Sequence, residues 1–325
     1  MQRDNSIDIL KFIAALLITW SHFDLPLGEY SYFATGGTFG DVLFFFCSGY
    51  TLLLSKNVTI SFFDWYKRRI NRIYPTVFAW ALVNAIFLQG KRNLLEIILY
   101  GGEWFISCIM IYYIAIWFVR KYSVNMLYWV IIIVSLLAIV WYFVIGTGSE
   151  NNSMYGDTYF KWLHYFIYML LGAIYGLLYK DKAVHIYPLW KSIVLIFICI
   201  ILFYALFSFY NRDGMINAVQ LLSLLPLAGF CIGSYCFCNS SYILGIYENK
   251  FGGIIIKFIG GLCLEIYLVQ GPFLTDKLNS IFPLNIVVLF FAILIAAYFL
   301  RCLSRIWSQT FKDGNYCFKE IVKPY

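Results

Sequence analysis

Lys11 and His22 are the residues whose types and spacing most directly suggest chemistry in this chain. They lie in an otherwise almost wholly apolar run, residues 7–23. Eleven helical steps make about three turns, so both side chains fall on nearly the same face, about 16 Å apart along the axis. Ionisable side chains inside a membrane segment are costly and commonly mark a functional site. The run therefore predicts a membrane helix with a cation near one end and a proton-transfer group near the other.

This first pattern is followed by other motifs in a fixed order. The motifs are Asp8-x2-Lys11-x10-His22, residues 40–50 (GDVLFFFCSGY), 69–75 (RINRIYP), 104–107 (WFIS) and 264–270 (LEIYLVQ). Together they resemble the integral-membrane acyltransferase-3 family. Two positions depart from the family pattern, because Lys11 replaces its usual arginine and Gln270 its usual histidine. Lysine keeps the charge but lacks the bidentate fork of arginine, and glutamine removes a possible titrating group.

The resemblance implies an O-acyltransferase that moves an acyl group, often acetyl, from acyl-CoA to a carbohydrate or lipid acceptor. His22 would be the general base that takes the proton of the acceptor hydroxyl as it attacks the thioester, a task that suits imidazole near neutral pH. Donors must stabilise the negative charge that develops on the thioester oxygen, and the candidates are Ser48, Tyr50 and backbone amides near Gly49. We expect acetyl-CoA as donor substrate and no permanently bound cofactor.

Two carboxylates near these motifs have more than one interpretation. Asp8 and Lys11 are three residues apart and can form an ion pair that lowers the cost of both in the membrane. Alternatively, Lys11 contacts CoA or its pantetheine arm. Asp41 can orient or charge-stabilise His22, pair with a cation, or cap the N-terminus of a helix.

Three late or isolated residues are candidate substrate contacts: Trp104, Glu265 and Gln270. Glu265 either lines the reaction cavity or pairs with a basic residue of the bundle, and Lys257 lies eight positions earlier on roughly the same helical face. Gln270 either hydrogen-bonds a sugar hydroxyl or satisfies a neighbouring helix.

Residues 60–72 (ISFFDWYKRRINR) form a basic, aromatic stretch. One interpretation is an interfacial anchor, with rings at headgroup depth and cations on anionic lipid. The other is that Arg69 and Arg72, at i and i+3, present guanidinium groups from one helical face to CoA phosphates, with Arg68 beside them. Both interpretations can hold at once.

Composition determines the broad class. The chain of 325 residues is 62% hydrophobic and only 13% charged, whereas soluble domains have about 25% charged residues. Apolar runs predict ten membrane helices, near 7–23, 38–55, 75–90, 98–119, 126–146, 160–179, 191–210, 215–236, 253–273 and 282–306. Because no linker separates domains, we expect one all-α polytopic bundle over residues 1–325 without a soluble accessory domain.

The distribution of Lys and Arg predicts the orientation. With the N-terminus inside, clusters such as 67–72, 120–121 and 180–182 face the cytoplasm, as the positive-inside rule requires. We therefore expect a multi-pass protein of the inner (plasma) membrane with both termini cytoplasmic, Lys11 toward the inner face and His22 toward the outer face. The expected partners are the lipid bilayer, acyl-CoA, and a glycan or lipid-linked sugar. The net charge of +7 needs no nucleic acid to explain it, and nothing indicates the oligomeric state.

Other polar features carry weaker signals. Cys231, Cys236 and Cys238 lack the spacing and the histidines of a zinc site, so we expect no metal. His185 is expected to be solvated and His164 to pack at the interface. Residues 24–37 contain acids and aromatics but no Lys or Arg, which suits sugar recognition but is also ordinary for an exposed loop.

Two other functional classes compete with acyl transfer. A transporter or flippase of glycolipids or small acids would also have about ten helices with intramembrane charges, but would need neither CoA-phosphate binding nor a base at His22. Broken helices in paired repeats would favour it, and the sequence shows no such pair. A membrane glycan polymerase or glycosyltransferase would carry a large outer loop rich in Arg or acids, and none is evident.

Overall fold

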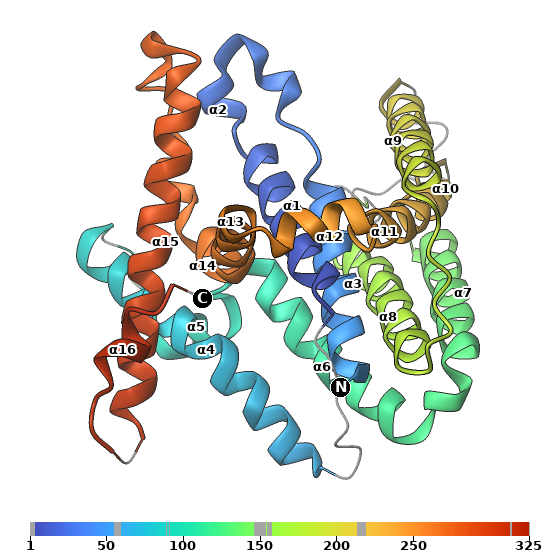
Figure 1. Ribbon diagram of the computed structural model, residues 1–325, viewed down its shortest axis with the longest axis horizontal. Helices are drawn as coiled ribbons and strands as arrows, with labels where there is room; N and C mark the ends of the chain where they lie inside the picture. Colours follow the sequence, from blue (N-terminus) through green and yellow to red (C-terminus); the bar gives the residue numbers. More distant parts are fainter. Residues whose placement is uncertain are drawn as a thin grey trace. The chain divides into compact units, whose positions relative to one another are not determined.

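All regular structure in the described part of the chain is helical, which confirms the predicted all-α class (Figure 1). The computed structural model describes residues 4–54, 60–88, 90, 92–145, 154, 158–212, 219–312 and 314–324. The chain forms two compact units: the first comprises residues 1–14, 38–58 and 118–253, and the second comprises residues 15–37, 59–117 and 254–325. Each unit is built from segments that are distant in sequence.

Seven helices in the described residues are long and apolar enough to cross a membrane, or nine if each of two bent helix pairs is one span. The seven are Gly37–Leu54, Glu103–Tyr122, Val124–Val144, Phe160–Lys180, Leu189–Ser208, Val219–Cys238 and Leu284–Thr310. The predicted third helix, near 75–90, is not among them. It is the second half of α4 (Phe62–Phe87), which begins in the basic aromatic stretch and contains Pro75.

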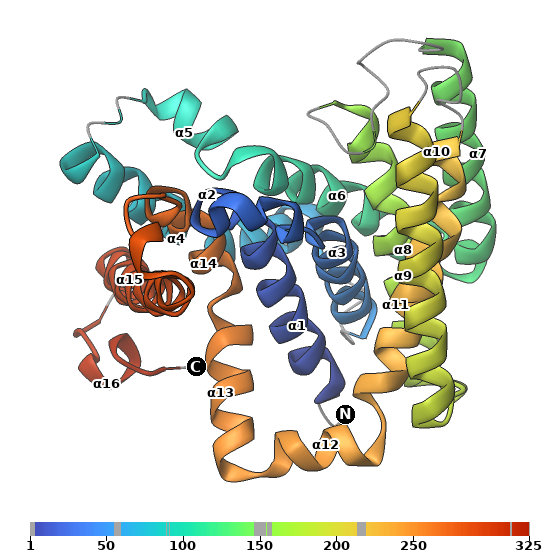
Figure 2. The same ribbon diagram turned by 90° about the horizontal axis from the view of Figure 1, so that it is seen from above.

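The first unit is a set of closely packed helices. After the first half of α1 (Ser6–Ser21) it contains α3 (Gly37–Leu54), η2 (Val124–Met126), α7 (Leu127–Ile145), α8 (Phe160–Lys180), α9 (Leu189–Arg212), α10 (Val219–Leu222), α11 (Leu224–Cys238) and α12 (Ser241–Glu248). Helices α9 and α11 lie side by side, as do α7 and α8 (Figures 1 and 2).

Glycines allow α3 and α8 to approach at backbone distance. A Cβ atom at Gly49 would lie 1.8 Å from the carbonyl oxygen of Met169, and one at Gly172 would lie 2.0 Å from that of Phe46. No larger residue fits at either position without moving a backbone, and small residues serve the same purpose in membrane bundles generally. Gly49 of the motif at residues 40–50 therefore has a packing role.

The second unit contains the remaining elements. They are α2 (Asp24–Leu27), η1 (Gly28–Phe33), α4, α5 (Leu94–Tyr100), α6 (Glu103–Tyr122), α13 (Lys250–Gly261), α14 (Cys263–Val269), η4 (Gly271–Phe273), η5 (Asn279–Ile281), α15 (Leu284–Thr310) and α16 (Phe318–Ile321), of which α6 and α13 continue into the first unit. Helix α15 packs against α4 and α14. Thr76 and Ser304 join α4 to α15 through a buried hydroxyl pair 2.9 Å apart.

The end of α1 positions His22. The helix ends at Ser21, two residues before the predicted end at residue 23, and the backbone amide of His22 donates to the carbonyl of Thr19 at 3.2 Å. The chain then bends by 64° into α2 and η1. Residues 24–33 of the predicted loop are consequently helical, and His22 lies exposed in the turn.

Candidate active site

The charges of two carboxylates of the second unit act on His22. The charges of Asp24 and Glu103 both act on its imidazole ring. Glu103 opens α6 with a φ of 54°, a left-handed conformation that is uncommon outside glycine and that concentrates at functional sites. Sequence reasoning missed both acids. The available signals were that Asp24 lies two residues after His22 and that Glu103 immediately precedes the Trp104-Phe105 motif.

The structure brings two of the late motifs together in the same unit. The Phe105 ring lies 5.6 Å from that of Tyr267, between ring centroids, and joins the start of α6 to α14. Trp104 is half-buried and meets Phe105 edge-on at 5.9 Å. The residues 104–107 and 264–270 therefore share one packed region, which their separation in sequence did not reveal.

Glu265 is held by an arginine that the sequence analysis did not single out. Arg301 of α15 donates from Nε to Glu265 Oε1 at 2.8 Å and from Nη2 to Oε2 at 2.6 Å, and Glu265 is buried. This bidentate geometry is the strongest form of the arginine–carboxylate pair. It supports the alternative in which Glu265 pairs within the bundle.

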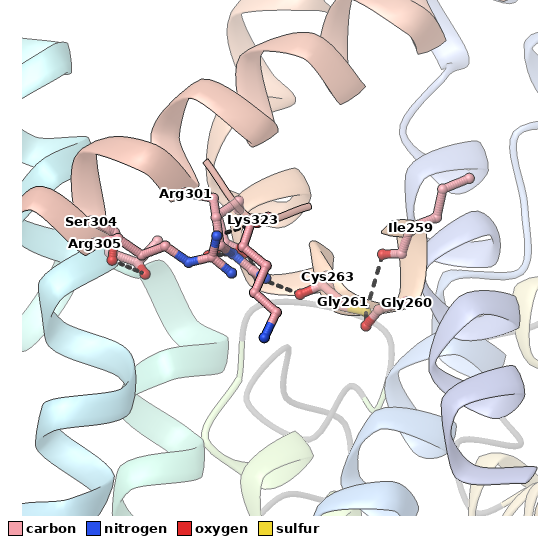
Figure 3. Close-up of polar contacts among 10 residues, drawn as sticks. Ile259, Gly260, Gly261, Cys263, Arg301, Ser304, Arg305 and Lys323 are labelled. Carbon is pink, nitrogen blue, oxygen red and sulfur yellow. Dashed lines mark hydrogen bonds and ion pairs between the residues drawn. The ribbon is translucent and has the colours of Figure 1, made fainter. Parts of the chain in front are cut away.

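The same guanidinium spans a break between two helices (Figure 3). Arg301 Nη2 also donates to the carbonyl of Gly261, the last residue of α13, while Glu265 lies in the first turn of α14. The two helices are bent by 55° at Leu262. The expectation that Lys257 and Glu265 share a helical face is therefore wrong, because it assumed one straight helix from 253 to 273.

Gln270 lies at the other end of α14. Its side chain is buried, and within the described structure its Oε1 atom accepts no hydrogen bond. Buried amide oxygens normally have a partner. An acceptor held in this state is suited to the hydroxyl of a bound molecule.

The basic face of α4 is arranged around aromatic rings. The Cζ atom of Arg69 lies 4.3 Å from the Trp65 ring centroid and 5.7 Å from that of Tyr113. The charges of Arg69 and Arg72 both act on Tyr113. Arginine can stack on a ring with its face and still present N–H groups from its edge. Arg68 and Arg72 are exposed, and Arg69 is half-buried.

The other predicted site residues belong to the first unit. Asp8 is buried and accepts a 2.9 Å hydrogen bond from the Tyr247 hydroxyl, and Lys11 is half-buried. The Tyr50 hydroxyl donates to the carboxylate of Asp4, which also accepts from Tyr235 at 3.2 Å. Tyr50 is thus part of a buried network, and its predicted role as a donor to substrate remains a prediction, as does that of half-buried Ser48.

Asp41 also has contacts of its own in the first unit. It lies four residues inside α3, so its predicted role as a helix cap is wrong. Its Oδ2 atom accepts a hydrogen bond from Tyr165 at 3.2 Å, and the charge of buried Lys161 acts on it. The hydrogen bond of Asp41 is thus with a tyrosine, and both pairing with a cation and orientation of His22 by Asp41 remain predictions.

The other two histidines occupy different environments. His164 is fully buried, and its ring centroid lies 4.2 Å from that of Tyr165, so it has a packing role inside the unit. Its predicted position at the membrane interface remains a prediction. His185 is exposed. Among the described residues, no group of three or more His, Cys, Asp or Glu side chains could hold a metal ion.

Comparison with known proteins adds one finding. The family model for an acyltransferase domain, of the acyltransferase-3 type, matches residues 4–303. No curated protein and no solved structure shows a significant match to the chain.

Proposed function

The chain belongs to the acyltransferase-3 family and carries helices that are long and apolar enough to span a membrane. We propose that this membrane acyltransferase takes an acyl group, expected to be acetyl, from cytoplasmic acyl-CoA. The acceptor is a hydroxyl of a cell-surface or secreted glycan or of a glycolipid. The carrying observation is His22, which lies exposed at the end of a membrane helix with two carboxylates acting on it.

The chemistry of this site follows from the imidazole and its neighbours. His22 accepts the proton of the acceptor hydroxyl as the oxygen attacks the thioester carbon. The carbon–sulfur bond then breaks, and the protonated His22 returns the proton to the CoA thiolate. The charges of Asp24 and Glu103 stabilise the imidazolium that exists between these two steps, as a carboxylate does in other acyl-transfer sites. The unpartnered Oε1 of Gln270 is a candidate acceptor for a substrate hydroxyl.

The donor is bound by the basic face of α4 in this proposal. Arg69 is restrained by Trp65 and Tyr113, so less of its side-chain entropy is lost when it contacts phosphate. Arg72 and Arg68 are exposed on the same helix and supply further charge. CoA carries several phosphates, and arginine is the residue best matched to phosphate geometry.

Substitution of Arg69 or Arg72 by alanine is expected to weaken CoA binding. Each removes a charge-assisted contact of about 1.5–3 kcal/mol. Calorimetry with CoA and with dephospho-CoA separates phosphate recognition from membrane anchoring, and Lys67→Ala is the matched control because it removes one exposed charge from the same helix. If all three variants bound CoA as tightly as the native chain does, only the interpretation of this stretch as an interfacial anchor would remain.

We also place the protein in the plasma membrane with both termini in the cytoplasm. His22 then faces outward and Arg69 inward, and an extended pantetheine arm would carry the thioester past Lys11. About 16 Å along a straight helix separates Lys11 from His22, which an extended arm can reach. The acyl group could cross while the rest of the cofactor stays inside.

Cysteine labelling in intact cells tests this orientation. In a background free of other cysteines, His22→Cys is expected to react with an impermeant maleimide from outside and Arg69→Cys only after permeabilisation. Native Cys317 is exposed near the C-terminal end, so retained alone it should react only after permeabilisation. Labelling of positions 22 and 69 from the same face would contradict transfer through the membrane.

One observation favours the transporter alternative. The two bent helix pairs, at 64° and 55°, are the kind of broken span on which transporters build their sites. Acetylated acceptor formed by the purified protein, without any transport partner, would decide for the acyltransferase. Translocation of a labelled glycolipid without acetylation would decide for the transporter.

A further inference from the structure

The second unit carries an open groove close in sequence to His22. Trp20, Leu27, Tyr30, Phe33 and Phe282 line it, with a volume of about 380 Å³. Its four aromatic side chains are all exposed. Aromatic faces exposed in this way leave a large contact area available to a ligand.

Hydrogen bonding and ring stacking fix the walls of this groove. The indole Nε1 of Trp20 donates to the carbonyl of Phe33 at 2.7 Å, which sets the angle of the indole. The rings of Tyr30 and Phe282 are stacked with centroids 5.3 Å apart. The hydrogen bond spans 13 residues, whereas the stacking joins segments that lie 252 residues apart in the chain (282 − 30).

Two asparagines hold the backbone beneath the rings. Asn285 Nδ2 donates to the carbonyl of Pro26 at 2.7 Å and to Asn279 Oδ1 at 3.0 Å. Asn279 Nδ2 in turn donates to the carbonyl of Leu25 at 3.0 Å. A groove built with its walls already fixed loses less entropy when a ligand binds.

The segments that supply the groove carry charge of one sign. Residues 24–37, which contribute Leu27, Tyr30 and Phe33, contain Asp24 and Glu29 and no Lys or Arg. In the segment before Phe282, Asp276 and Lys277 are adjacent in sequence and of opposite sign, so they add no net charge. A phosphate, a uronate or an anionic lipid headgroup would therefore meet net negative charge, whereas a neutral ring or a cationic amine would not.

We propose that this groove is the acceptor subsite, and that it takes a neutral or amino-bearing pyranose of a glycan. The inference rests on the proposed acyl transfer and specifies its acceptor. The C–H face of a pyranose packs on the rings, and an ammonium group is attracted to both ring faces and carboxylates. The hydroxyl that reaches His22 is the one acylated.

Three tetrasaccharides that differ only in charge test the proposal. β-1,4-linked tetramers of glucose, glucosamine and glucuronic acid are titrated calorimetrically into the full chain in lipid nanodiscs. The neutral and amino tetramers are expected to bind, and the affinity of the uronate tetramer is expected to be lower by at least about tenfold. Trp20→Ala and Tyr30→Ala are each expected to weaken tetramer binding about tenfold and to raise the acceptor KM by the same factor, with acetyl-CoA binding unchanged.

The control variant is Trp141→Ala, since Trp141 is 39% exposed and Trp20 38%. Trp20→Phe and Tyr30→Phe keep a stacking face, so they should retain most of the affinity even if an alanine variant does not fold. The subsite would be overturned if Trp20→Ala left tetramer affinity unchanged, or if Trp141→Ala lost as much affinity as Trp20→Ala. It would also be overturned if the uronate bound most tightly or if no tetramer bound saturably.

The same experiment distinguishes this inference from the proposed function. If Trp20→Ala leaves tetramer affinity intact but lowers the melting temperature of the chain in nanodiscs, the groove is part of an aromatic belt at the membrane surface, and acyl transfer can still stand. If the tetramers bind as expected but are never acetylated from acetyl-CoA, the groove stands as a sugar site and the proposed reaction fails.

Discussion

Replacement of His22 by alanine is expected to reduce acyl transfer by about 10²–10⁴-fold, the usual contribution of a general base. Expression and membrane insertion should be unchanged, because the side chain is exposed in the turn after α1 and the backbone makes the hydrogen bond to Thr19. The measurement is turnover of purified protein in nanodiscs with acetyl-CoA and an acceptor glycan. The expected loss is in kcat, with the affinity for CoA preserved.

His185→Ala provides the matched control, because it removes the other exposed histidine from a region outside the second unit. Its turnover should equal that of the native chain. Near-normal turnover in His22→Ala would remove the catalytic assignment and with it the central element of the proposed mechanism. Asp24→Asn and Glu103→Gln should give smaller losses, because each removes only one of the two charges that act on the ring.

Removal of either member of the Glu265–Arg301 ion pair is expected to lower the stability of the folded protein more than any other proposed substitution. Removal of one member of a buried ion pair costs about 3–5 kcal/mol, because an uncompensated charge is left behind. Glu265→Leu and Arg301→Leu are each expected to lower the melting temperature and the yield of folded protein. The double variant should recover part of the loss, since neither charge then remains.

Thermal unfolding of the purified variants in the same detergent measures this cycle. Glu248→Gln is the control, because it neutralises an exposed glutamate, and it should change the melting temperature little. Additive losses in the double variant would show that Glu265 and Arg301 are not coupled. Glu265 would then return to its other interpretation, a side chain that lines the reaction cavity.

The outcome for Glu265 shows where local pattern reasoning failed. Counting eight positions back to Lys257 assumes that the helical face continues, and the 55° bend at Leu262 ends that continuity. The partner is Arg301, which lies 36 residues away and reaches Glu265 only because α15 packs against α14. A pairing of this kind depends on packing between helices, and no periodicity within one segment encodes it.

Asp41 and Glu103 show the same limit of local pattern reasoning, which misassigned the first residue and overlooked the second. The helix-cap alternative for Asp41 followed from local pattern alone, yet Asp41 accepts a hydrogen bond from Tyr165 and the charge of Lys161 acts on it, both residues lying on α8 more than a hundred residues later. Glu103 carries no local signal except its position before Trp104. Its charge acts on His22 because the fold places the start of α6 near the end of α1.

The sequence by itself determined the class of the molecule and its family. Apolar runs and sparse charge require helices in a membrane, since a backbone in lipid must satisfy its own hydrogen bonds, and the ordered motifs carried the acyltransferase resemblance that the match to residues 4–303 confirmed. Only the tertiary structure decided the bends after Ser21 and at Leu262, the partner of Glu265 and the carboxylates around His22. These features depend on which helix faces pack together, and that is settled by the whole set of side chains because each interface must exclude voids and leave no charge alone.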